Sequence, residues 1–256
     1  MQIIKFAAVA AVGSATLCLA QEAAPVALEE SKAAEVKVSA LFASGMATDE
    51  GFILSEKPVF AYDVKVATEA FGVIPLELGV WANYDLTDGK KNDATKDHCF
   101  TEIDLTLGTS FECPAGIEYG VQLTSYQYPN SSADGEESLL LSAAKKFDFG
   151  LIAGFDFEYM LTGGGEKDMY LAPYIGYEAT LDEESNLGVE LLVRPSYCIQ
   201  DIGSDAWLGC MLKAQVNYGP FFAYVKHWVQ IEDKIYTDEM NDKMDTAFGI
   251  GYQTEL

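Results

Sequence analysis

Carboxylate side chains recur at alternate positions in several segments of the sequence. Glu102 and Asp104 stand two residues apart, as do Asp156 and Glu158, and an apolar residue separates the members of each pair. Alternate side chains of a β-strand point to the same face of its sheet. Rings of carboxylates around a passage favour cations. These pairs therefore predict an acidic surface that attracts cations.

The same alternation assigns thirteen charged residues, nine acids and four bases, to one polar face. We expect Arg194 and the lysines to pair with neighbouring acids, because an unpaired charge in a confined space is costly. The alternative to an open pore is a packed polar plug, and the sequence does not decide between them. The predicted pore-lining residues are Lys65, Glu77, Asp85, Glu102, Asp104, Glu118, Asp156, Glu158, Glu178, Glu190, Arg194, Lys213 and Lys226.

Residue patterns for catalysis or cofactor binding are weak. His227 has the alternation of the apolar face, His98 lies in a long loop, and no GxSxG motif is present. A lipid-modifying enzyme with a Ser-His pair is therefore the least favoured alternative, and no enzymatic activity is expected. GGGEK at 163–167 lacks the GK[ST] of a phosphate-binding loop, and no CxxC indicates zinc. No cofactor or metal is expected.

The charged side chains must be positioned by β-strands, in which successive side chains alternate between two faces. In FAYDVKVAT at 60–68, one face is apolar and the other is mostly polar, and most later segments repeat this pattern. The predicted strands are 35–46, 57–68, 75–86, 99–111, 115–128, 137–147, 150–162, 168–179, 186–198, 207–218, 220–231 and 244–256.

The lengths of these strands favour a membrane protein. They run about 11 to 14 residues, whereas strands of soluble proteins average about 5 to 6 and membrane-crossing strands need about 9 to 11. Their connections alternate between short turns, such as YG, and long loops, such as LTDGKKNDATKDH. That rhythm is typical of outer-membrane barrels, whose apolar face points to lipid. We therefore predict an all-β, antiparallel, up-and-down transmembrane β-barrel of about 12 strands.

The N-terminal region predicts export. Lys5 is followed by an apolar run that ends in small residues, which indicates a signal peptide over 1–20. Residues 21–34 read as a flexible lead, and 35–256 as one barrel domain. Cleavage removes one Lys and no acid, so the formal charge moves from −24 to −25. A surface this acidic argues against nucleic-acid binding.

Four cysteines remain after cleavage. Cys99 and Cys113 fall at opposite ends of one predicted strand, which is too far for a disulfide. Cys198 and Cys210 flank one loop, but their alternation places them on opposite faces of the sheet. A β-bulge would allow that pair, so the pairing stays open.

Three segments carry a family resemblance. LGVWANYDLTDG at 78–89, followed by TEIDLTLG at 101–108, resembles the TorF-type outer-membrane porin family, and SEKPVFAYDV at 55–64 is similar to its second strand. The likeness extends over 35–256. The chain departs from the family in MATDEG, which lacks an arginine, and in its final YQTEL, which lacks a terminal Phe. The resemblance implies a bacterial outer-membrane barrel that conducts small solutes.

These observations together predict a narrow, cation-preferring porin in the bacterial outer membrane. Its expected partners are outer-membrane lipid and lipopolysaccharide, small cationic or neutral solutes, and the barrel-insertion machinery. The main alternative is a closed structural or surface-adhesion barrel with a polar plug. Acidic loops such as TDEMNDKMD at 237–245 would serve adhesion by binding divalent cations, although a solvated loop explains them more simply.

Overall fold

The computed structural model describes most of the chain beyond its N-terminal region. The predicted signal peptide, nearly all of the lead, His98 and Cys99 lie outside the described residues, as do most residues of the long loops. No helix within the described part is long and apolar enough to cross a membrane. The described residues are 34–49, 53–55, 57–70, 74–86, 100–129, 134–164, 166–201, 205–230 and 246–255.

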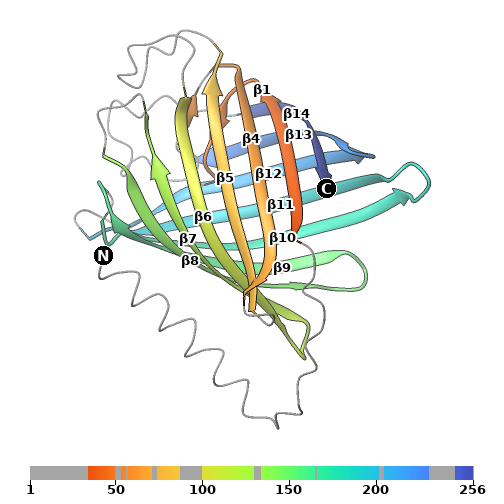
Figure 1. The fold of residues 1–256 in the computed structure, drawn as a ribbon, viewed down its shortest axis with the longest axis horizontal. Coiled ribbons are helices and arrows are strands. Elements are labelled where there is room, and N and C mark those ends of the chain that lie inside the picture. Colours follow the sequence, from red (N-terminus) through yellow and green to blue (C-terminus); the bar gives the residue numbers. More distant parts are fainter. Residues whose placement is uncertain are drawn as a thin grey trace. The chain divides into compact units, whose positions relative to one another are not determined.

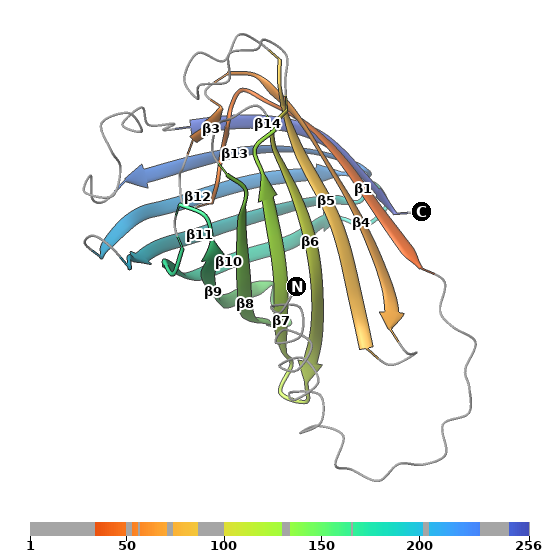
Figure 2. The same ribbon diagram turned by 60° about the vertical axis from the view of Figure 1, so that its left-hand side comes forward.

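Twelve antiparallel strands form a closed barrel in the order β1-β14-β13-β12-β11-β10-β9-β8-β7-β6-β5-β4 (Figures 1 and 2). The prediction of twelve strands is confirmed, and each strand end lies within three residues of its predicted boundary. The barrel strands are β1 (Glu35–Ala43), β4 (Val59–Ala70), β5 (Ile74–Asp85), β6 (Phe100–Cys113), β7 (Ile117–Gln127), β8 (Glu136–Lys146), β9 (Leu151–Thr162), β10 (Met169–Asp182), β11 (Leu187–Ile199), β12 (Ala206–Tyr218), β13 (Phe221–Gln230) and β14 (Thr246–Glu255).

The first and last barrel strands close the sheet. Val38 of β1 stands opposite Thr254 of β14 on one side and opposite Val64 of β4 on the other. Each barrel strand therefore has two hydrogen-bonded neighbours, and closure removes the unpaired edges that an open sheet would expose. Barrel strands adjacent in sequence are also adjacent in space, which confirms the up-and-down topology.

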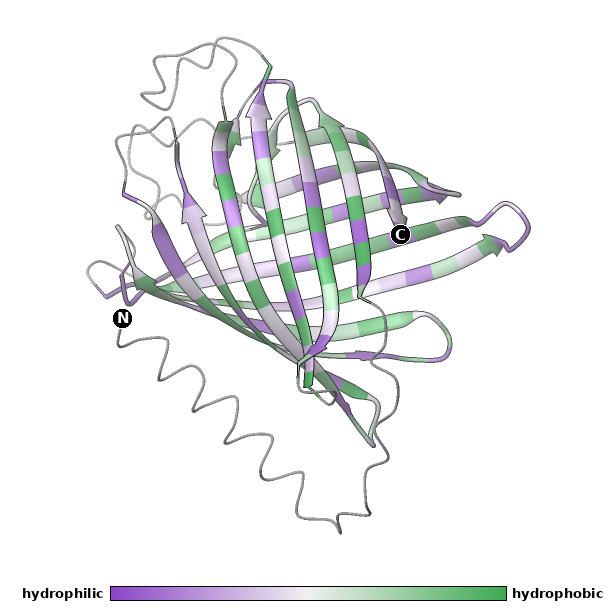
Figure 3. Ribbon diagram, in the orientation of Figure 1, coloured by the Kyte–Doolittle hydropathy of each residue, from purple (hydrophilic) through white to green (hydrophobic). Residues whose placement is uncertain are grey.

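The two faces of the sheet differ sharply. Large apolar side chains on one face are exposed, including Leu105 at 49%, Val193 at 47% and Ile250 at 63%. Polar side chains on the opposite face are buried, with Asn83 at 0% and Glu102 at 4% exposure. Figure 3 shows the resulting alternation of hydrophobic and hydrophilic residues along the strands. The apolar face is therefore the outer surface of the barrel, and the polar face surrounds its interior.

A charge on the outer face is expected to destabilise the barrel in lipid. Leu107 lies near the middle of β6 and is 42% exposed. Leu107→Arg should cost about 2 to 4 kcal/mol of unfolding free energy, because the bilayer midplane disfavours arginine. Urea titration in lipid vesicles measures this change. The neighbouring Thr106→Arg, on the inner face, is the matched control, and an equal cost for both variants would contradict the assignment of the two faces.

The connections differ in length between the two ends of the barrel. Residues 219–220 suffice to join β12 to β13, whereas residues 231–245 separate β13 from β14. Gly150 lies in the short turn between β8 and β9 with φ of 91°, and a Cβ there would meet the carbonyl oxygen of Glu178 at 2.2 Å. Only glycine fits such a turn without strain. The predicted alternation of short turns and long loops is confirmed.

A small hairpin within the first long connection was missed from the sequence, which predicted a loop over 47–56. Here β2 (Met46–Ala47) pairs with β3 (Ile53–Ser55) in a separate two-stranded sheet. The segment is too short and irregular to show a period of two, which explains the omission. We call β2, β3 and the connecting residues 48–49 the inner hairpin, because its contacts lie inside the barrel.

The prediction about cysteine pairing, which rested on the alternation of side chains along the strands, agrees only partly with the structure. The register shifts between Ser196 and Tyr197, so the β11–β12 pair contains the kind of irregularity that would have permitted a disulfide. The structure nevertheless forms no disulfide between Cys198 and Cys210. Cys113 is half-buried at the end of β6 and carries a free thiol.

Candidate functional site

The barrel interior brings the thirteen predicted residues onto one face of the sheet. They occupy strands β4 to β13, on the face opposite to the exposed apolar side chains. Their role in conduction stays a prediction. The sequence prediction omitted further charged residues that the same alternation places on the interior face. Extending the period of two along each strand would have found them. These residues are Lys37, Asp63, Glu112, Glu136 and Lys146.

Each of the four predicted interior bases forms an ion pair, as expected. Two of the pairs join adjacent strands, but the other two do not. Ala172 of β10 stands opposite Asp156 and is small enough to let Arg194 reach across β10 to β9. The pairs and their N–O distances are Lys65–Glu77 at 3.6 Å, Arg194–Asp156 at 3.3 Å, Lys213–Glu190 at 2.9 Å and Lys226–Asp49 at 2.9 Å.

The inner hairpin is attached to the wall formed by β12, β13 and β14. Lys226 of β13 donates to Asp49, and the indole nitrogen of Trp228 donates to the carbonyl oxygen of Thr48 at 3.1 Å. Ala47 packs in a buried cluster with Trp228 and Met211. These are long-range contacts that no local sequence signal reveals.

The other strand of the inner hairpin contacts a different part of the wall. Ser55 donates to the carboxylate of Asp85 on β5 at 3.1 Å, and β3 lies against β6. The strands β4, β1 and β14 separate β5 from β13 around the barrel. The inner hairpin therefore spans part of the interior. It connects the wall of β12 to β14, which we call the basic wall because Lys213 and Lys226 lie on it, to the acidic wall of β5 to β9.

Electrostatic attraction fixes the ionisation of Asp49. Burial opposes its charge, but Lys226, Arg194 and Lys213 together lower the pKa of the Asp49 carboxyl to about 2. Its side chain is still 42% exposed to the interior, so water screens part of this attraction. The contact contributes fully above the ordinary pKa of 3.8 and is lost as the pH falls towards 2.

Acid is therefore expected to release the inner hairpin only at very low pH. Trp228 is 8% exposed beneath it and reports its position. With Trp81 and Trp207 replaced by Phe, the Trp228 emission should stay blue down to pH 4 and shift to the red as the pH approaches 2. Circular dichroism checks that the barrel stays folded. A red shift centred above pH 4 would show that Asp49 does not control this contact.

Carboxylates and hydroxyls crowd the acidic wall formed by β5 to β9. Tyr126 donates to Glu158 at 2.8 Å, and the hydroxyl of Ser138 lies 3.5 Å from that of Tyr126. Glu102 and Asp104 lie beside each other on the same wall, and their side chains interact directly. Alternation also places Asn83 and Tyr126 here, although the prediction considered charged residues only.

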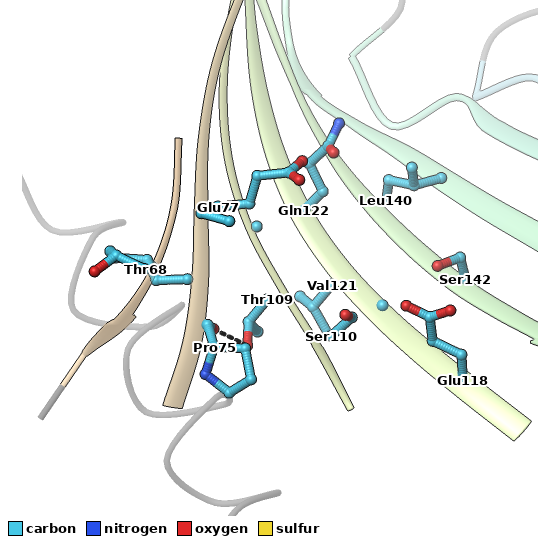
Figure 4. Close-up of a pocket in the computed structure, with 14 residues that line it drawn as sticks. Thr68, Pro75, Glu77, Thr109, Ser110, Glu118, Val121, Gln122, Leu140 and Ser142 are labelled. Carbon is cyan, nitrogen blue, oxygen red and sulfur yellow. Dashed lines mark hydrogen bonds between the residues drawn. The ribbon is translucent and has the colours of Figure 1, made fainter. Parts of the chain in front are cut away.

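A cavity of about 310 Å³ opens in the interior near the short-turn end (Figure 4). Glu77, Glu118 and Gln122 line it with Ser142. Small side chains make the space, because β6 and β7 contribute Gly108 and Gly120 at this level. The cavity holds enough volume for several water molecules, since each water occupies about 30 Å³.

His227 is exposed on the outer face, as predicted, and its Nδ1 lies 2.9 Å from the hydroxyl of Thr246. No group of three or more His, Cys, Asp and Glu side chains in the described ranges converges to hold a metal ion.

One solved structure supports the class of fold. The COG4313 outer-membrane channel from Pseudomonas putida F1 is similar over 93% of this chain and 98% of its own, with 11% identity and a TM-score of 0.55. OmpF from Salmonella typhi, solved with daunomycin, aligns over 88% of this chain and 97% of its own, with 10% identity and a TM-score of 0.38. No family model and no curated protein matches the sequence.

The chain is thus an all-β protein with the closed barrel fold of outer-membrane channels. At 11% identity the likeness concerns the fold. It agrees with the broad class that the sequence predicts, and the narrower resemblance to TorF-type porins stays a prediction.

Proposed function

We propose that this protein is a bacterial outer-membrane channel that passes small solutes and prefers cations. One observation carries the proposal. The interior bases Lys65, Arg194, Lys213 and Lys226 are each paired with an acid, and the thirteen predicted interior residues contain nine acids and only four bases. An interior with a surplus of carboxylates attracts cations and repels anions.

The proposed location follows from the outer face. The many exposed apolar side chains of the outer face support a lipid environment, since soluble monomers rarely expose apolar surface this extensive. The predicted signal peptide supports export, and partners would then be outer-membrane lipid, lipopolysaccharide and the barrel-insertion machinery. The TorF-type resemblance supports the same proposal.

Conductance of the purified protein in planar bilayers tests the proposal. We expect discrete current steps and, across a salt gradient, a reversal potential on the side that indicates cation flow. Protein denatured by heat before addition is the control. The absence of steps at every voltage from protein that is folded would overturn the proposed channel.

A closed structural barrel is the second candidate, and the inner hairpin favours it. Contacts at both the basic and the acidic wall hold this segment inside. A barrel of twelve strands is narrower than the sixteen-stranded porins, so a single inserted segment removes a large share of its passage. The same bilayer experiment separates the two candidates.

A further inference from the structure

Three buried oxygen atoms on the acidic wall have no amide, hydroxyl or ammonium donor among the residues that the structure describes. They are Asn83 Oδ1 on β5, and Glu102 Oε2 and Asp104 Oδ1 on β6. The side chain of Asn83 is fully buried and that of Glu102 is 4% exposed. Buried polar atoms in proteins are nearly always satisfied, so three such atoms together require an explanation.

The backbone brings the three oxygens together. Asn83 and Glu102 stand directly opposite each other in the β5–β6 register, where side chains on one face are about 5 Å apart. Asp104 is two residues further along on the same face and contacts Glu102. The amide nitrogen of Asn83 donates to the hydroxyl of Thr101 at 2.6 Å, whereas its Oδ1 has no donor among the described residues.

The charges of Glu102 and Asp104 need a counterion. Two carboxylates held side by side in a buried position repel each other and lose hydration. Among the described residues, neither carboxylate forms an ion pair with a lysine or arginine. The interior bases are engaged with other acids, for example Arg194 with Asp156. Neutralisation must therefore come from a proton or from a bound cation.

We propose that Asn83, Glu102 and Asp104 form a binding site for a hard divalent cation of the Ca²⁺ type. Two carboxylates match its charge, and the amide oxygen is a third ligand of the kind that calcium accepts. Calcium tolerates irregular geometry and completes its shell with water, whereas Mg²⁺ demands a regular octahedron. Softer metals prefer imidazole or thiolate ligands, which the described residues beside Glu102 do not supply.

The site requires only the folded barrel and does not depend on conduction. Asp85 lies two residues from Asn83 on the same face and accepts a hydrogen bond from Ser55 of the inner hairpin. The bound cation would therefore lie beside the point where β3 meets the acidic wall. With so few protein ligands we expect a weak site, with a Kd of about 10⁻⁴ to 10⁻³ M.

Calorimetric titration of the detergent-purified, EDTA-treated barrel with CaCl2 tests the site. We expect saturable binding, together with a higher temperature of unfolding in millimolar CaCl2. Glu102→Gln, Asp104→Asn and Asn83→Leu should each weaken binding at least ten-fold. Glu118→Gln, which removes a carboxylate from the inner face of β7, is the control and should leave binding unchanged.

Several results would overturn the proposal. If wild-type protein shows neither saturable binding nor a change in its unfolding temperature, the site does not exist. Equal loss of binding in Glu118→Gln would show that calcium collects over the acidic protein without a specific site. Calcium could also leave the unfolding temperature of the wild-type barrel unchanged while Glu102→Gln raises that temperature. That result would show that the carboxyl groups of Glu102 and Asp104 share a proton and hold no cation. The wild-type titration decides even where a variant fails to fold.

Discussion

Removal of the inner hairpin is expected to raise the conductance of the barrel at least about two-fold, because the segment fills part of an interior that twelve strands leave narrow. A short Gly-Ser link in place of residues 45–57 would leave the barrel strands intact, since β1 and β4 pair directly with each other. Single-channel recordings in planar bilayers measure the change.

A milder pair of variants separates the position of the inner hairpin from loop length. Lys226→Met breaks the contact with Asp49, and Trp228→Phe removes the donor to Thr48. Combined, they should raise the conductance or its fluctuations. Lys146→Met is the matched control, because it breaks an interior ion pair with Glu178 that lies at the short-turn end. Unchanged conductance in the protein lacking residues 45–57 would show that this segment does not restrict the passage.

Neutralisation of Glu102 and Asp104 together is expected to lower the cation-to-anion permeability ratio at least about five-fold. A carboxylate about 6 Å from a passing ion contributes about 3 kcal/mol at an effective dielectric constant near 20, and salt reduces this value. The double variant Glu102→Gln and Asp104→Asn keeps the shape of both side chains. Reversal potentials across a salt gradient, recorded in EDTA, measure the ratio.

Glu178→Gln is the control for this experiment. It removes one carboxylate from the interior face instead of two, and this carboxylate is 42% exposed and paired with Lys146 at 2.5 Å, at the short-turn end of the barrel. Its effect on the reversal potential should be small. Identical reversal potentials for the double variant and the wild type would refute the assignment of the acidic wall to the conducting path.

The fold was largely predictable because it repeats one simple rule. Lipid outside and polar groups inside force a strict period of two along each strand, so segments such as 75–86 identify both the strand and its faces. The lengths of the connections then indicated the up-and-down topology, because short turns and long loops alternate along the chain. The strand ends differ by up to three residues in both directions, since β10 continues three residues beyond its predicted end and β1 ends three residues before it.

The interior was predictable only in part. Alternation identified which charged residues share the polar face, but it does not identify their partners. Lys226 pairs with Asp49, which lies 177 residues away, and this contact exists only after the barrel has closed. The uncharged Asn83 was assigned to the correct face, yet its buried, unsatisfied oxygen becomes apparent only in three dimensions.

Thiol accessibility at two adjacent positions of β6 tests the account most directly. In a variant with its native cysteines replaced by serine and inserted in lipid vesicles, Thr106→Cys should react with a small, cationic, water-soluble reagent. Leu107→Cys should resist it and react only with a reagent dissolved in the lipid. The reverse pattern, or equal reaction of both in a soluble protein without lipid, would contradict a barrel whose polar face encloses water.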